Sequence, residues 1–145
     1  MRIMIVDDDF LVRTNLKRLL ETSEKCRNAG YMIIAEAADG DQALHQIEMT
    51  EPDVIISDIK MPQMDGIETA KYIKENFPHV HIIILSGYND FEYARSLLRY
   101  GVKDYLLKPV SSEELEKALA NTLHSLETEK RRDLAIRLYR EYEKD

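Results

Sequence analysis

Short apolar runs alternate with amphipathic segments along most of the chain. Five of these runs are rich in Ile, Val and Leu and show little alternation of apolar and polar residues. Such runs are typical of strands that are buried on both faces of a parallel sheet. They predict strands over residues 3–6, 31–35, 54–58, 80–85 and 102–107.

The amphipathic segments between these strands predict helices. In the first segment, Leu11, Leu16 and Leu20 recur at helical spacing. At the start of the last segment, Ser111 is followed three residues later by Glu114, which is the signature of a capping box. Five helices are predicted, over residues 10–25, 39–51, 65–77, 89–101 and 111–126.

Strands that alternate with helices favour right-handed crossovers and a parallel sheet with helices on both faces. We therefore predict an α/β fold, a doubly wound five-stranded parallel sheet with five helices on its two faces. One connection is unusual, because residues 21–28 are mostly polar and surround the single cysteine, Cys26. The first helix is expected either to extend outward through this stretch or to end in a longer loop.

The sequence changes character near its C-terminus. We expect one domain over residues 1–126 and a helical extension over residues 127–145, which is dense in charge but nearly balanced. In the extension, Leu134, Leu138 and Tyr142 are four residues apart and predict a helix with one narrow apolar stripe. This helix is either a solvated continuation of the last helix or a dimerising or linker helix toward an output domain that is absent from this chain.

Composition and charge narrow the class of protein. The chain has 145 residues, a net charge of −7 and a pI of about 5.2, which argues against a nucleic-acid surface as its main partner. With one cysteine it forms no internal disulfide, which fits a reduced setting. No apolar run approaches the roughly 20 residues of a membrane span. We expect a soluble cytoplasmic protein.

Polar residues follow four of the predicted strands. They are Asp7 and Asp8 after the first strand, Asp58 at the end of the third, Ser86 after the fourth and Lys108 after the fifth. Because the carboxyl ends of parallel strands share one edge of the sheet, we expect these side chains to meet there. Three clustered carboxylates repel one another by about 4 kcal/mol per pair at about 4 Å and an effective dielectric of about 20. The cluster therefore calls for a cation.

The chemistry of this cluster predicts a site for phosphoryl transfer. Its ligands are hard oxygens, which favours Mg²⁺ over Zn²⁺, and the four histidines lack metal-ligand spacing. A divalent cation, an ammonium group and a hydroxyl group around one carboxylate suit a phosphoryl group, which Asp58 would accept as an acyl phosphate. Each residue alone has a structural explanation, as a helix cap, a turn residue or a solvated lysine. Their joint placement favours the site.

Residues 1–126 resemble the receiver domain of two-component response regulators. The resemblance rests on four stretches, residues 3–9, 53–66, 84–88 and 104–109. Residues 86–119 most resemble receivers that are joined to AraC-type helix-turn-helix output domains. The resemblance implies a flavodoxin-like strand order, 2-1-3-4-5.

The resemblance also implies a role for each site residue. Asp58 would be the phosphoacceptor. Asp7, Asp8, Asp58 and the backbone carbonyl of Lys60 would be the ligands of Mg²⁺. Ser86 and Lys108 would contact the phosphoryl group, and Tyr105 would be the switch aromatic that moves with Ser86. The Lys108–Pro109 peptide bond would be cis.

As a receiver, the protein would be a switch and not a metabolic enzyme. A sensor histidine kinase would donate the phosphoryl group, and phosphorylation would change the face formed by residues 89–126. A homodimer would form through that face or through the C-terminal helix. Transcription would be controlled, and DNA contacted, only through the absent output domain.

Two alternatives stay open. A phosphatase or phosphotransferase with an aspartyl intermediate would require a second acid/base carboxylate shortly after the nucleophile, but Lys60 stands there. A phosphorylation-independent receiver-like interaction module would keep the fold alone. Such a module would have lost an acidic, lysine or hydroxyl residue of the site, yet all of them are present.

Overall fold

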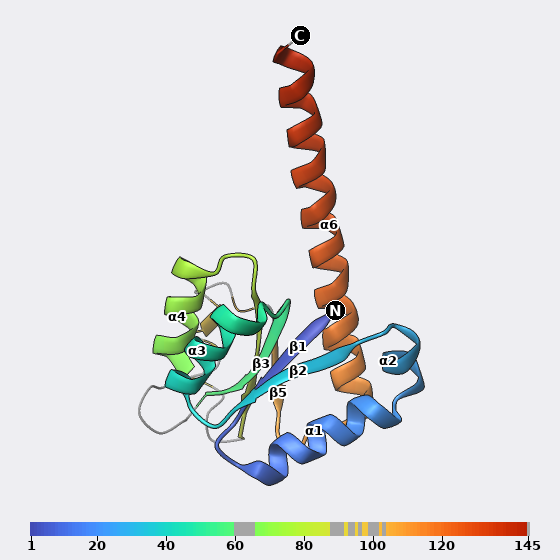
Figure 1. The fold of residues 1–145 in the computed structure, drawn as a ribbon. Coiled ribbons are helices and arrows are strands. Elements are labelled where there is room, and N and C mark those ends of the chain that lie inside the picture. The colour runs from blue at the N-terminus through green and yellow to red at the C-terminus, as the bar shows by residue number, and fades with distance from the viewer. Residues whose placement is uncertain are drawn as a thin grey trace.

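A computed structural model describes residues 1–59, 66–87, 92, 95, 97, 98, 102 and 104–144 of the chain. Five parallel strands form one sheet in the order β2-β1-β3-β4-β5 (Figure 1), so the predicted topology is confirmed. The strands are β1 (Arg2–Val6), β2 (Met32–Ala37), β3 (Val54–Asp58), β4 (His81–Ser86) and β5 (Asp104–Leu107).

Helices cover both faces of this sheet. The described helices are α1 (Phe10–Thr22), α2 (Glu24–Asn28), α3 (Gly40–Thr50), α4 (Gly66–Asn76) and α6 (Ser112–Lys144). α1, α2 and α6 pack on one face, and α3 and α4 pack on the other. The helix predicted over residues 89–101 lies almost entirely outside the described residues.

The strands alternate their side chains between two apolar layers. In β1, Ile3 and Ile5 face the layer of α1 and α6, whereas Met4 and Val6 face the layer of α3 and α4. All four of these side chains are fully buried. The three inner strands β1, β3 and β4 are buried on both faces, which explains why their sequences are almost continuously apolar.

The polar stretch after α1 is neither an outward extension nor a long loop, so the helix predicted over residues 10–25 was wrong at its end. α1 stops at Thr22 because Ser23 has extended backbone angles, and α2 begins directly afterwards. The Ser23 hydroxyl accepts a hydrogen bond from the backbone N–H of Cys26 and donates one to Glu116 Oε1 at 2.7 Å. The short helix α2 thereby turns Cys26 into the core, where its side chain is 2% exposed.

Six strand boundaries differ from the prediction by one or two residues. β1 begins at Arg2, β2 and β4 differ at both ends, and β5 begins at Asp104. The ladder sets these ends, because Val6 pairs with Ala37 and Ser86 pairs with Leu107. The ends of the strands depend on pairing with neighbouring strands, and the apolar runs alone do not predict that pairing.

α6 is one continuous helix of 33 residues that leaves the body of the molecule halfway along its length (Figure 1). Its first half packs on the sheet through buried side chains, of which Leu126 is the last. Just beyond, Glu129 Oε2 lies 3.0 Å from Nε2 of the buried His81 in β4. The extension is therefore helical, and its outer part is exposed to solvent. Within the described residues, no helix has the length and apolarity needed to cross a membrane.

Candidate functional site

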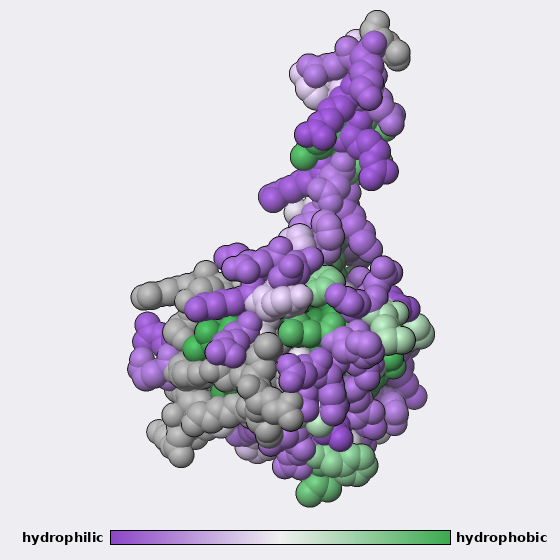
Figure 2. Space-filling view, turned by 60° about the vertical axis from the view of Figure 1, so that its left-hand side comes forward, coloured by the Kyte–Doolittle hydropathy of each residue, from purple (hydrophilic) through white to green (hydrophobic). Residues whose placement is uncertain are grey.

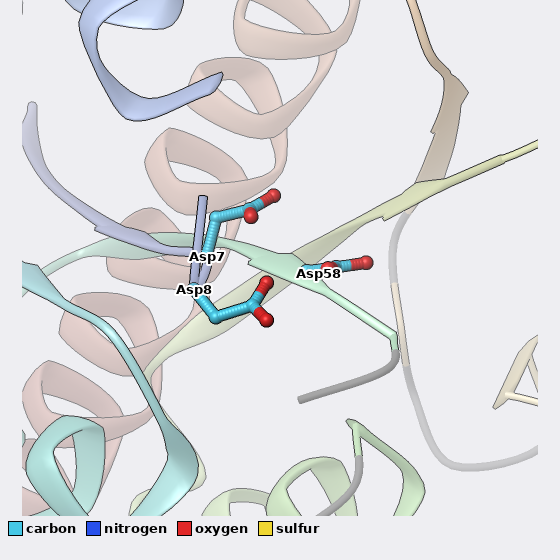
Figure 3. A group of neighbouring side chains, drawn as sticks. All are labelled: Asp7, Asp8 and Asp58. Atoms are coloured by element: carbon cyan, nitrogen blue, oxygen red, sulfur yellow. The ribbon is translucent and has the colours of Figure 1, made fainter. Parts of the chain in front are cut away.

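The ends of β1 and β3 bring three carboxylates together at one edge of the sheet. Asp7, Asp8 and Asp58 each offer an oxygen atom, and these oxygens lie within 4.8 Å of one another. Their side chains point toward a common space beside the sheet (Figure 3). The predicted meeting of these residues is confirmed.

The main chain after β1 holds the first two carboxylates in place. The backbone N–H of Asp7 continues the ladder by donating to Ala37 O at 3.0 Å. Asp7 Oδ1 accepts a hydrogen bond from the backbone N–H of Asp9 at 2.9 Å. Asp9 in turn caps α1 by accepting from the backbone N–H of Leu11. Consecutive turns therefore aim Asp7 inward, where it is fully buried, and leave Asp8 exposed at the rim.

Asp58 is the last residue of β3 and is almost buried, with 7% of its surface exposed. Its Oδ1 accepts a hydrogen bond from the backbone N–H of Ile59 at 2.7 Å. Its Oδ2 lies 3.3 Å from Nζ of Lys108. One oxygen of Asp58 is thus fixed by the main chain, and the other faces a cation.

Lys108 joins two of the carboxylates. Its Nζ also lies 2.9 Å from Asp7 Oδ2, and its backbone N–H donates to Ser86 O at 2.8 Å, which extends the β4–β5 ladder. Burial lowers the pKa of Lys108, but the hydrogen bond and charge of Asp7 and the charge of Asp58 outweigh burial, so that the pKa is raised. The lysine is therefore charged, and three carboxylates with one ammonium group leave a net charge of −2.

Ser86 contributes a hydroxyl group without a hydrogen-bond partner in the part of the chain that the structure describes. Its side chain is fully buried, and Oγ is among the buried polar atoms that lack a partner. An unsatisfied buried hydroxyl costs about 1–3 kcal/mol. A buried polar atom of this kind marks a place where a ligand can bind.

The site fits a magnesium ion. Mg²⁺ binds oxygen ligands at about 2.0–2.1 Å, and the three carboxylates each offer an oxygen within 4.8 Å of the other two. The local charge of −2 is balanced by one divalent cation. Lys60, whose backbone carbonyl was predicted as a further ligand, lies outside the described residues.

Two further predictions concern β5 and its end. The Lys108–Pro109 peptide bond is cis, as predicted. Tyr105 pairs with Ile84 in the neighbouring strand and is half-buried against the apolar layer of α3 and α4. It therefore lies on the strand next to β4, which ends in Ser86, and its role as a switch residue stays a prediction.

Sequence reasoning missed Arg13, which supports the acidic cluster from α1. Its guanidinium donates a hydrogen bond to the backbone carbonyl of Asp7, and its Nε lies 3.3 Å from Glu36 Oε1. Lys17, one turn later, bonds Glu36 Oε2 at 2.9 Å. The sequence offered one indication of this support, because Arg13 and Lys17 are four residues apart and lie on one face of the helix that follows the aspartates.

The family model and the similar proteins all point to the same protein family. Residues 3–120 match the response regulator receiver domain family. The chain is 34% identical over 133 residues to the transcriptional regulatory protein YesN of Bacillus subtilis, a match that covers 92% of this chain and 34% of YesN. It is 42% identical over 114 residues to the transcriptional regulatory protein YdfI of the same organism, covering 79% and 51%. The chain thus spans a third to a half of these relatives.

Solved structures agree with the sequence matches. The receiver domain of AraT, a response regulator from Geobacillus stearothermophilus, superposes with a TM-score of 0.79 at 34% identity, over 89% of this chain and 97% of that one. The two-component transcriptional regulator AraC from Clostridium phytofermentans gives a TM-score of 0.76 at 30% identity, over 90% and 98%. This chain therefore belongs to the response regulator receiver domain family.

Proposed function

We propose that the protein is a phosphorylation-controlled switch in which Asp58 accepts a phosphoryl group from a sensor histidine kinase in a Mg²⁺-dependent reaction. One observation carries the proposal. The Asp58 carboxylate lies 3.3 Å from the Lys108 ammonium and has an oxygen within 4.8 Å of oxygens of Asp7 and Asp8, and the neighbouring strand ends in a buried hydroxyl that has no partner among the described residues. This arrangement provides a nucleophile, an ammonium group, carboxylate ligands for a divalent cation and a hydrogen-bond donor for one phosphoryl group.

The transfer uses the two oxygens of Asp58 differently. Its Oδ1 is held by the N–H of Ile59, which leaves Oδ2 as the attacking atom. Oδ2 forms a bond to phosphorus as the bond between phosphorus and the histidine nitrogen of the kinase breaks, and the imidazole keeps the electron pair. Lys108 and Ser86 would then contact the phosphoryl oxygens. Water later attacks phosphorus and restores the carboxylate.

Asp7 and Asp8 would hold the metal, together with Asp58 and the backbone carbonyl of Lys60. When bound, Mg²⁺ supplies positive charge that stabilises the negative charge on the transferred group. The residues themselves supply the fixed geometry, because Asp7 is tied to β2, to Asp9 and to Arg13. Preorganised charges of this kind lower a barrier without rearranging during the reaction.

The readout would begin where Ser86 and Tyr105 lie on adjacent strands. A phosphoryl group that bonds the hydroxyl of Ser86 favours one position of the loop that follows it, and Tyr105 would turn inward with that loop. The face formed by residues 89–126 would then differ between the two states. The relatives are transcriptional regulatory proteins longer than this chain, which supports a receiver over residues 1–126 and a linker over residues 127–145, leading to a DNA-binding output domain.

An alternative is an interaction module that uses the receiver fold without phosphorylation. The Ser86 hydroxyl favours the switch, since it is buried and bonds no other residue that the structure describes, as expected of a group kept to bond a phosphoryl ligand. The protein would in either case act on no external substrate of its own.

The proposal is tested by intact-mass analysis after incubation with acetyl phosphate and Mg²⁺. We expect one added phosphoryl group in the natural protein and none in Asp58→Asn or when EDTA replaces Mg²⁺. Asp53→Asn, which makes the same change at the opposite end of the same strand, is the matched control and should label normally. Undiminished labelling of Asp58→Asn would refute the assignment of the phosphoacceptor.

A further inference from the structure

The outer part of α6 carries an apolar patch that is separate from the core. Residues 127–133 are all polar, and after them come five large apolar side chains that are 51–80% exposed. They are Leu134, Ile136, Leu138, Tyr139 and Tyr142. Apolar atoms are visible on the projecting helix amid hydrophilic ones in the space-filling view (Figure 2). This patch plays no part in the packing of the body.

Helical geometry gathers most of the patch into one stripe. At about 100° per residue, Leu134, Leu138 and Tyr142 lie within about 80° of one another, and Ala135 and Tyr139 continue the same stripe. Arg131 falls in the middle of the stripe, one turn before Ala135. Charged residues flank it, with Lys130, Arg137 and Glu141 on one side and Arg132 and Glu143 on the other.

Charge is distributed unevenly between the body and this helix. Residues 127–145 contain six acidic and six basic side chains, so the whole net charge of −7 belongs to residues 1–126. In this neutral segment, Lys130 and Arg132 beside the stripe precede Glu141 and Glu143 beside it, so the stripe can pair with itself when two copies run in opposite directions. Two strongly acidic bodies, in contrast, repel each other when they lie side by side.

We propose that the outer part of α6 is an interaction surface for a second copy of this chain, and that the two helices pair antiparallel about a point between Ile136 and Arg137. In this register Lys130 lies near Glu141 of the partner subunit. On the other flank, Arg132 lies near Glu143 of the partner subunit. Both flanks of the stripe thus carry opposite charges in apposition, and each pair occurs twice by symmetry.

The centre of the stripe also suits the antiparallel orientation. Ala135 meets Leu138 of the partner subunit, and Arg131 meets the ring of Tyr142 of the partner subunit, an arrangement that favours a cation–π contact. A parallel pair would instead bring Arg131 against Arg131 of the partner subunit. It would also place the two acidic bodies next to each other, whereas the antiparallel pair separates them along the helix.

The contact is small, so the association should be weak and should depend on concentration. The overlap covers residues 129–144, about 24 Å of helix, and buries less surface than the interfaces of stable complexes. Residues 127–144 also project from the body as a helix near the length at which isolated helices are marginal in water. Pairing would stabilise this helix. The inference does not depend on phosphorylation.

Charge reversal tests the proposal by sedimentation equilibrium of the whole chain over a range of concentrations. We expect the natural protein to self-associate, and Lys130→Glu/Arg132→Glu or Glu141→Lys/Glu143→Lys to weaken the association about thirtyfold or more, because four attractive pairs become repulsive. An equimolar mixture of the two variants should associate again. The matched control is Arg140→Glu/Lys144→Glu, which makes the same change in charge on the side of the helix opposite the stripe and should associate like the natural protein.

A monomeric natural protein, or a mixture that fails to recover, would overturn the proposal. The orientation is tested separately by disulfide formation between Arg131→Cys and Tyr142→Cys chains, since Cys26 is buried and gives little background. In an antiparallel pair the mixture should cross-link, while each variant alone should not, because its cysteines are about 16 Å apart along the axis. Efficient cross-linking of each variant with itself would instead establish a parallel pair and overturn the antiparallel one.

Discussion

At the scale of single residues, Asp58 and Ser86 are both buried at the site, but their surroundings differ. The carboxylate of Asp58 has a backbone donor at 2.7 Å and an ammonium group at 3.3 Å. The hydroxyl of Ser86 has no partner among the described residues. The described part of the fold therefore stabilises the carboxylate of Asp58 but offers no bond to the hydroxyl of Ser86, which a ligand would supply. Substitution of Ser86 should therefore impair phosphorylation without lowering the free energy of unfolding.

Ser86→Ala should leave the free energy of unfolding unchanged or raise it by up to about 1 kcal/mol, since it removes an unsatisfied buried polar atom. The same substitution should slow labelling by acetyl phosphate. Urea unfolding and intact-mass time courses measure the two effects. Ser57→Ala is the control in β3, where the hydroxyl donates to Asp58 O at 3.0 Å, and it should cost about 1 kcal/mol. A comparable loss of stability in both variants would contradict the prediction.

The raised pKa of Lys108 predicts how the site responds to alkaline pH. Burial lowers this pKa and the carboxylates of Asp7 and Asp58 raise it further, so the folded state holds the lysine proton more tightly than the unfolded state. The resulting stability is fully present below the ordinary pKa of 10.5 and is lost as the pH rises through the folded pKa. With EDTA present, the difference in unfolding free energy between the natural protein and Lys108→Met should fall as the pH rises above 10.5. A difference that stays constant would exclude this linkage.

At the scale of helices and strands, the sequence predicts the features that depend on residues close together in the chain. Short apolar runs identify the strands, and the capping box at Ser111 identifies the start of α6, where the hydroxyl accepts from the N–H of Glu114 at 3.2 Å. The acidic site was predictable because strand ends meet at one edge. The break at Ser23 was not, since its hydroxyl bonds a distant partner, Glu116. Arg13 had a weak signal in the spacing of basic residues on α1, but its partner Glu36 could not be identified from that spacing. The spacing of apolar residues along the chain does not predict such contacts.

Ser23→Ala should destabilise the protein by about 1–2 kcal/mol, because it removes both the cap of α2 and the bond to Glu116. Thermal or urea unfolding measures the effect. Thr22→Ala, at the adjacent position, removes only an exposed hydroxyl that donates to the carbonyl of Arg18 within α1, and it should stay within about 0.5 kcal/mol of the natural protein. Equal effects of the two substitutions would show that Ser23 does not join α1, α2 and α6.

At the scale of the whole molecule, the body and the projecting helix are joined by few contacts beyond Leu126. The contact between Glu129 and His81 is one of them, and Glu127 lies close enough to contribute to the raised pKa of Tyr31, which burial raises most. The buried residues of both apolar layers all lie within residues 1–126. The body should therefore fold without the extension.

A chain that ends at Leu126 should unfold cooperatively with a loss of at most about 1 kcal/mol, since the carboxylate of the lost pair is partly exposed. Glu129→Gln in the full chain should account for much of that loss. Circular dichroism during thermal unfolding tests both variants. A truncated chain without a cooperative transition would show that residues 127–145 belong to the folding unit.

The continuity of α6 has a mechanical consequence. Its first turn follows closely after Lys108, and its far end, at Lys144, is about 27 Å beyond the last buried residue. A tilt of about 10° at the base would swing that tip by about 5 Å, nearly the pitch of the helix. The helix is thus a lever arm, which converts an angular change too small to disturb the core into a displacement large enough to shift whatever is attached to its end.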